Sequence, residues 1–136
     1  MPPCEGGYKE FRLGNLFDIT TSKSVDKDGL IPIEKTVDAI QFIGRTQVNN
    51  GLQGYTKRLF FNPNPAQTFS IIQVGDSVMQ YRESEWYASQ NIFLLKPRLS
   101  KLVDTKLYII GTTNKALMIF NGGYNIYPTL DKLKDL

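Results

Sequence analysis

Residues 39–75 combine basic and amide side chains with a complete absence of carboxylates. Polar side chains concentrate between residues 45 and 58 of this segment, and they include Arg45, Thr46, Asn49, Asn50, Tyr55, Lys57 and Arg58. An arginine can donate two hydrogen bonds to guanine, and asparagine can pair with adenine, in the major groove of DNA. Lysine and threonine hold phosphates and set the register. The pattern therefore predicts contacts with double-stranded DNA.

Further candidates of the same chemistry lie at the ends of predicted hairpins, at Gln80, Arg82 and Gln90. A second stretch without acidic residues, 86–103, carries Lys96, Arg98 and Lys101. The net charge is +3, and the isoelectric point is near 9.0. This balance mildly favours a polyanionic partner, and the distribution of the charges says more than their sum.

Several enzyme classes are disfavoured by what the composition lacks. The chain has no histidine and one cysteine. It therefore lacks the commonest general base and the Ser–His and Cys–His nucleophile pairs. Zinc binding is also disfavoured, because zinc sites use Cys and His ligands. Neither a Walker loop nor a GxGxxG motif occurs. We expect a non-catalytic domain that needs no metal and no cofactor.

A small metal-dependent nuclease is the weaker alternative, because such an enzyme needs paired carboxylates for magnesium. The nearest match is Asp26, Asp28 and Glu34 with Lys35. Glu34 and Lys35 are adjacent, so on a strand they would point to opposite faces. A second partial match, Tyr108 to Lys115, resembles half of the GIY-YIG nuclease motif but lacks the arginine that should follow it.

The chain length of 136 residues fits one domain, residues 1–136. No apolar run is long enough to cross a membrane, and the N-terminus has no secretory signal pattern. Cys4 can form no internal disulfide, which favours a reducing, cytoplasmic setting.

The pattern of apolar residues predicts a mixture of hairpins and helices. Strands are expected at residues 30–33 (an edge strand, because of Pro32), 41–46, 68–74, 77–81 and 91–97, the last buried on both faces. Asn49-Asn50-Gly51 predicts a tight turn. The result is a single α+β domain of β-hairpins in a curled mixed sheet, with one or two packed helices.

Two helices are expected in the C-terminal third. Val103, Leu107, Ile110 and Leu117 fall at helical spacing, with Ser100 or Asp104 as the cap, and Asn121 to Gly123 would end this helix. The tail, residues 129–136, has leucines at three-residue steps and predicts a second helix.

Four stretches of the chain share their order and spacing with one known family. They are Leu13 to Ser24, Ile43 to Tyr55, Ser89 to Pro97 and Tyr124 to Leu136. In this order they resemble the target-recognition domains of restriction–modification specificity subunits, as in type I systems. The resemblance implies a domain that inserts loops into the major groove at one half of a split DNA site. It places Arg45, Asn49, Asn50, Tyr55 and Lys57 on or near those loops, with Lys23, Gln80 and Gln90 as further contacts.

The resemblance also implies partners. A methyltransferase subunit would be directed to adenine, and a full system adds a translocating restriction subunit. Full specificity subunits carry two recognition domains, so a second recognition domain or a second copy of this chain would read the other half of the site. The alternative is a protein-interaction module, such as a decoy that occupies a methyltransferase.

Overall fold

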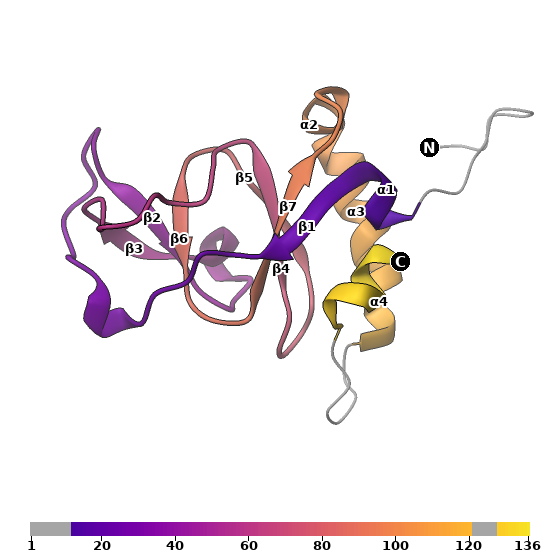
Figure 1. Ribbon diagram of the computed structural model, residues 1–136, viewed down its shortest axis with the longest axis horizontal. Coiled ribbons are helices and arrows are strands. Elements are labelled where there is room, and N and C mark those ends of the chain that lie inside the picture. Colours follow the sequence, from indigo (N-terminus) through magenta and orange to yellow (C-terminus); the bar gives the residue numbers. More distant parts are fainter. Residues whose placement is uncertain (1–11, 121–127) are drawn as a thin grey trace, which may run out of the picture.

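Two β-sheets form the centre of the computed structural model, which describes residues 12–120 and 128–136. The elements are α1 (Leu13–Leu16), β1 (Phe17–Thr21), η1 (Lys27–Gly29), β2 (Ile40–Ile43), η2 (Val48–Gly51), β3 (Leu52–Thr56), β4 (Thr68–Ile72), β5 (Met79–Arg82), β6 (Trp86–Ala88), β7 (Ile92–Pro97), α2 (Lys101–Asp104), α3 (Lys106–Leu117), η3 (Met118–Phe120) and α4 (Leu130–Lys134). Sheet A has the strand order β1-β7-β4-β5, and sheet B has the order β3-β2-β6. Figure 1 shows sheet B at one end of the molecule, sheet A in the middle, and α3 and α4 at the other end.

Sheet A is covered on both faces. Phe93 and Leu95 of β7 pack in one core cluster with helical residues that include Leu117. Ile92 and Leu94, on the opposite face of the same strand, pack in a second cluster with Trp86 of sheet B and its neighbours. This arrangement confirms the prediction that residues 91–97 form a strand buried on both faces. The layers are therefore helices, sheet A and sheet B.

The predicted hairpin and the α+β fold are confirmed. Strand β4 pairs with β5 in antiparallel register, from Thr68 opposite Arg82 to Ile71 opposite Met79. Because side chains alternate along a strand, Met79 and Tyr81 face the helices, while Gln80 and Arg82 face the layer between the two sheets. This alternation decides the role of both polar residues.

The predicted edge strand at residues 30–33 is reduced to a single bridge, between Pro32 and Thr56. The segment still lies along β3, because the Ile33 amide donates to the Tyr55 carbonyl and the Lys57 amide donates to the Ile31 carbonyl. Proline has no N–H to extend the ladder. The location of this segment is confirmed, and its length as a strand is not.

The C-terminal helices agree with the sequence only in part. α4 is confirmed, with the Thr129 hydroxyl accepting from the Lys132 amide and Leu133 fully buried. The predicted core face of α3 is wrong at Leu107, which is 81% exposed. The helix begins only at Lys106, after a break at Thr105, so its buried face runs through Thr113 and Leu117.

Ser100 occupies the N-cap position of α2, although its side chain makes no capping hydrogen bond, and Asp104 caps neither helix. One polar residue of α3 has a different structural role. The Asn114 side chain accepts from the Met79 amide at 2.6 Å and donates to the Met79 carbonyl at 3.4 Å, as a neighbouring strand would. It thereby pairs the exposed edge of β5.

Two of the sequence features, Cys4 and Asn121 to Gly123, lie outside the described residues. Within the described ranges, no helix is long and apolar enough to cross a membrane.

Candidate nucleic-acid interface

Several connecting segments meet at one edge of sheet B, the edge formed by the ends of its strands. Strands β2 and β6 are parallel, and β3 is antiparallel to β2. The residues that follow β2, follow β6 and precede β3 must therefore lie at the same edge. These are the 44–51 turn (residues 44–51) and the Ser89-Gln90 connection. We call this edge the reading edge.

The 44–51 turn has an unusual backbone that its sequence explains. Asn49, Asn50 and Gly51 have φ values of 52°, 54° and 83°, in the left-handed region that Asn and Gly tolerate best. The Gly44 amide closes the turn by donating to the Gly51 carbonyl at 2.9 Å. The predicted turn is confirmed, and it leaves Arg45, Asn49 and Asn50 exposed.

Replacing Gly51 with alanine is expected to destabilise the protein by about 1–2 kcal/mol, because L-residues with a side chain disfavour left-handed φ. The new Cβ would also lie 2.9 Å from Gln80 Oε1 and 3.0 Å from Arg82 Nη2. Urea unfolding measures the effect. Gly111→Ala is the control, because Gly111 is helical with no atom near its Cβ position, and alanine there should stabilise by up to about 1 kcal/mol. Equal stability of the two variants would contradict the left-handed strain.

A small pocket opens at the reading edge. It has a volume of about 240 Å³ and is lined by Val25, Asp26, Phe42, Arg45, Ser89 and Gln90. The Gln90 amide nitrogen lies 3.4 Å from Asp26 Oδ1. The buried Ser89 hydroxyl has no hydrogen-bond partner among the described residues, and no described carboxylate forms an ion pair with Arg45. We call this the Arg45 pocket. It offers donors and an acceptor close together, which is the chemistry that reads a base edge.

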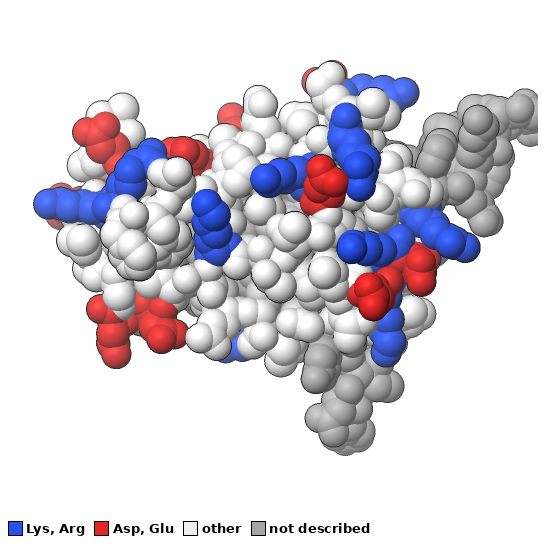
Figure 2. Space-filling model, viewed as in Figure 1, with Lys and Arg blue, Asp and Glu red and all other residues white. Residues whose placement is uncertain are grey.

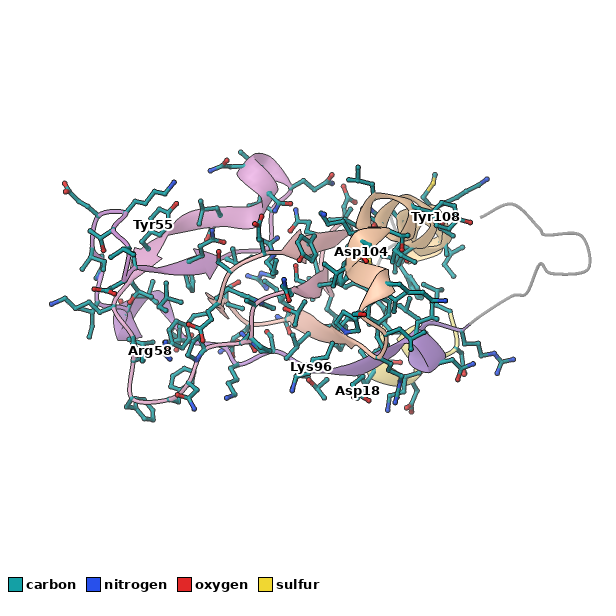
Figure 3. The ribbon with its side chains drawn as sticks, turned by 90° about the horizontal axis from the view of Figure 1, so that it is seen from above. Asp18, Tyr55, Arg58, Lys96, Asp104 and Tyr108 are labelled. Carbon is teal, nitrogen blue, oxygen red and sulfur yellow. The ribbon has the colours of Figure 1, made fainter. Side chains whose placement is uncertain are left out.

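Lys57 and Arg58 lie at the opposite end of sheet B. They line a broad hollow of about 860 Å³ together with Asp38 and Glu85. Arg58 Nη2 donates to Glu85 Oε1 at 2.9 Å, and both side chains are about half exposed. Figure 3 shows Arg58 and Tyr55 at the sheet B end of the molecule, far from Tyr108 of α3. A five-residue strand such as β3 spans about 16 Å, so the two ends can contact separate parts of one duplex.

The sequence predicted that Gln80 and Arg82 lie at the surface, but both side chains are buried. Their exposed fractions are 7% and 2%. Burial, which disfavours the charged form, lowers the pKa of Arg82 to about 10. Both residues were predicted to contact DNA because they lie near the end of a hairpin. Their placement between the two sheets corrects that prediction, and they are left out of the interface.

The second acid-free stretch lies elsewhere. Lys96 lies on β7, opposite Asp18 of β1 in sheet A, and Arg98 Nη2 pairs with Asp18 Oδ1 at 2.9 Å. Figure 2 shows basic and acidic side chains interspersed over one face of the molecule. Lys96 and Arg98 thus lie at sheet A beside Asp18, and not at the reading edge of sheet B.

The described residues include no cluster of three or more Asp, Glu, Cys or His side chains that could hold a metal ion. In particular, Asp26, Asp28 and Glu34, the set considered for magnesium with Lys35, form no such cluster in the described part of the chain.

Comparison with known proteins decides the family. The family model of the type I restriction modification DNA specificity domain matches residues 5–136. The chain belongs to this family. The specificity domain matches no protein of curated function.

Two solved structures share its fold. The S subunit of the type I restriction-modification system from M. genitalium aligns with a TM-score of 0.65 and 15% identity, covering 92% of this chain and 32% of that one. The HsdS subunit from Thermoanaerobacter tengcongensis aligns with a TM-score of 0.66 and 14% identity, covering 100% of this chain and 33% of that one. The specificity domain thus spans about a third of the length of each subunit.

Within this specificity domain, the predicted residues fall into four groups. Arg45, Thr46, Asn49, Asn50 and Gln90 meet at the reading edge, and Lys57 and Arg58 lie at the other end of the sheet with Tyr55 of β3 near them. The exposed Lys23 lies beside β6, because its backbone N–H and C=O both bind the buried Asn64 side chain. Gln80 and Arg82 form the last group, which is buried.

Sequence reasoning missed Asp26 as part of the interface. It had been considered only as a magnesium ligand. It joins the Arg45 pocket because the segment before it runs alongside β6, where Ser24 bridges Ala88 in parallel and the Val25 amide donates to the Ala88 carbonyl. No local pattern around Asp26 indicates that long-range pairing.

Proposed function

We propose that this specificity domain reads the base sequence of one half of a split duplex DNA site and supplies no catalysis itself. Membership of the DNA specificity family supports sequence-specific recognition. The single observation that carries the proposal is the reading edge, where the Arg45 pocket and the 44–51 turn bring exposed donors together on a rigid sheet.

We propose different DNA contacts for the residues at the two ends of sheet B. At the reading edge, Arg45, Asn49 and Gln90 contact base edges, and Asp26 adds an acceptor that suits the amino group of cytosine. Asn50 contributes less, because its side-chain amide already donates to the Tyr81 carbonyl at 3.2 Å. Lys57 and Arg58 at the opposite end of sheet B, with Tyr55 near them, and Lys23 beside β6 hold phosphates and set the register. Thr46 adds a phosphate contact at the reading edge itself.

Selection of bound duplexes from a random pool tests the proposal directly. The wild-type protein should enrich a short common motif, and the same selection with an Arg45→Ala, Asn49→Ala variant should enrich that motif weakly or lose a position of it. A wild-type pool that stays random after repeated rounds would contradict sequence recognition.

We further propose that the partner is the methyltransferase subunit of a type I system, with the restriction subunit joining in a full complex. The second half of the site would be read by a second recognition domain or a second copy of this chain. Exposed apolar side chains of α3 and η3, Leu107, Met118 and Ile119, support a protein contact on the helical layer. Co-elution with a type I methyltransferase subunit that persists in Lys57→Ala, Arg58→Ala protein tests this contact independently of DNA. Loss of co-elution in that variant would contradict it.

A further inference from the structure

An arginine without an acidic partner lies directly beneath the 44–51 turn. Arg82 is 2% exposed, and no described carboxylate forms an ion pair with it. Its pKa of about 10 still leaves it charged at neutral pH. A buried charge is costly unless hydrogen bonds compensate it, so the groups that accept from Arg82 are under strong constraint.

Those acceptors connect Arg82 to the turn. Arg82 Nε donates to Ser70 Oγ at 3.1 Å, and Nη2 donates to Gln80 Oε1 at 2.5 Å. A guanidinium group can only donate, so it holds the oxygen of the Gln80 amide towards itself. The Gln80 amide nitrogen must then point away, and it donates to the Thr46 carbonyl at 3.2 Å.

Two further contacts tie the turn to the same strand. Asn50 donates from its side-chain amide to the Tyr81 carbonyl. Gly51 packs so closely on Gln80 and Arg82 that a Cβ there would meet both side chains. The turn that carries Arg45 and Asn49 is thus seated on β5 through hydrogen bonds and close packing, and the charge of Arg82 orients the central hydrogen bond.

We propose that Arg82 is a positioning residue, which sets the 44–51 turn through the Gln80 amide and thereby determines base discrimination without touching DNA. The inference rests on the proposed function. It predicts that loosening the Gln80–Thr46 hydrogen bond lowers discrimination even when the fold is intact.

The sharpest variant is Gln80→Glu. Arg82→Met would remove a buried charge together with two hydrogen bonds, whereas a carboxylate at position 80 still accepts from Arg82 and gives it an ionic partner. The same carboxylate cannot donate to the Thr46 carbonyl. The unfolding midpoint should therefore stay close to the wild-type value while the turn loosens. Gln73→Glu is the matched control, because Gln73 also donates from its side chain to a backbone carbonyl, that of Pro128, on a different segment.

Two readouts separate positioning from simple structural support. In the free protein, the Gly44 and Val48 amides, which are bonded within the turn, should exchange with solvent at least about tenfold faster in Gln80→Glu than in wild type or Gln73→Glu. With DNA, the ratio of affinities for the selected duplex and a single-base variant should fall about fivefold or more, which is the lower end of what one base contact provides.

An unchanged affinity ratio in folded Gln80→Glu protein would overturn the inference, and so would unchanged exchange of the turn amides. A uniform loss on all duplexes would also overturn it, because added negative charge alone weakens binding regardless of sequence. If the wild-type protein shows no preferred sequence, the proposed function fails, and the exchange rates alone then decide whether the Gln80–Thr46 hydrogen bond holds the turn.

Discussion

Replacing Arg45 with alanine is expected to reduce discrimination at one base pair of the recognised site by roughly 5- to 150-fold, which corresponds to about 1–3 kcal/mol. Arg45 is exposed at the rim of the Arg45 pocket and forms no ion pair with the described carboxylates. Its guanidinium group is therefore free to contact a guanine, whose O6 and N7 accept two parallel hydrogen bonds. Alanine at this position leaves those acceptors unpaired in the groove.

The measurement is a set of dissociation constants at one salt concentration, for the selected duplex and for each single-base substitution of it. Arg45→Ala should flatten the preference at one position and leave the others intact. Lys57→Ala is the control, because a phosphate contact is expected to weaken all duplexes by a similar factor. An equal loss on every duplex in Arg45→Ala would make Arg45 a phosphate contact and remove it from the reading surface.

The affinity for DNA is expected to fall by roughly forty-fold when the salt concentration rises from about 50 to 200 mM. Each phosphate neutralised by a protein cation releases counterions and adds about 0.9 to the slope of log affinity against log salt. Lys23, Lys57 and Arg58 are the proposed phosphate contacts, which gives a slope of about −2.7. Titration of a fluorescent duplex at several salt concentrations measures it.

Single-residue variants show how much each cation contributes to the slope of log affinity against log salt. Lys57→Ala should reduce its magnitude by about 1. Glu85→Gln should raise affinity for all duplexes by a similar factor, since it frees Arg58 from the ion pair at 2.9 Å. A slope near zero would argue against phosphate contacts and favour the alternative of a protein-interaction module.

Much of the fold could be predicted from local patterns. Asn49-Asn50-Gly51 encodes its turn because these residue types tolerate left-handed φ, and all three adopt it. The nearly unbroken apolar run of β7 indicates burial on both faces, which the helices and sheet B provide. The start and the core face of α3 were not predictable, because the break at Thr105 shifts which residues face sheet A.

The candidate site was predictable only as a set of residue types. The absence of carboxylates from residues 39–75, together with Arg45 and the asparagines, is a property of the sequence alone, and it indicated the turn at the reading edge. The order of the four stretches likewise indicated the family that the comparison confirmed.

What only the tertiary structure decided is which of these side chains meet and which are buried. Gln80 and Arg82 are residue types typical of a DNA-contacting surface, yet they face the layer between the sheets. Side chains alternate along β5, and Met79 and Tyr81 pack against the helical core, so Gln80 and Arg82 must point to the other face. Asp26 and Gln90 are 64 residues apart, and they meet because the chain before Asp26 runs beside β6. The residue types follow from the sequence, whereas long-range strand pairing and the packing of one sheet on another set the side of the strand on which each one lies.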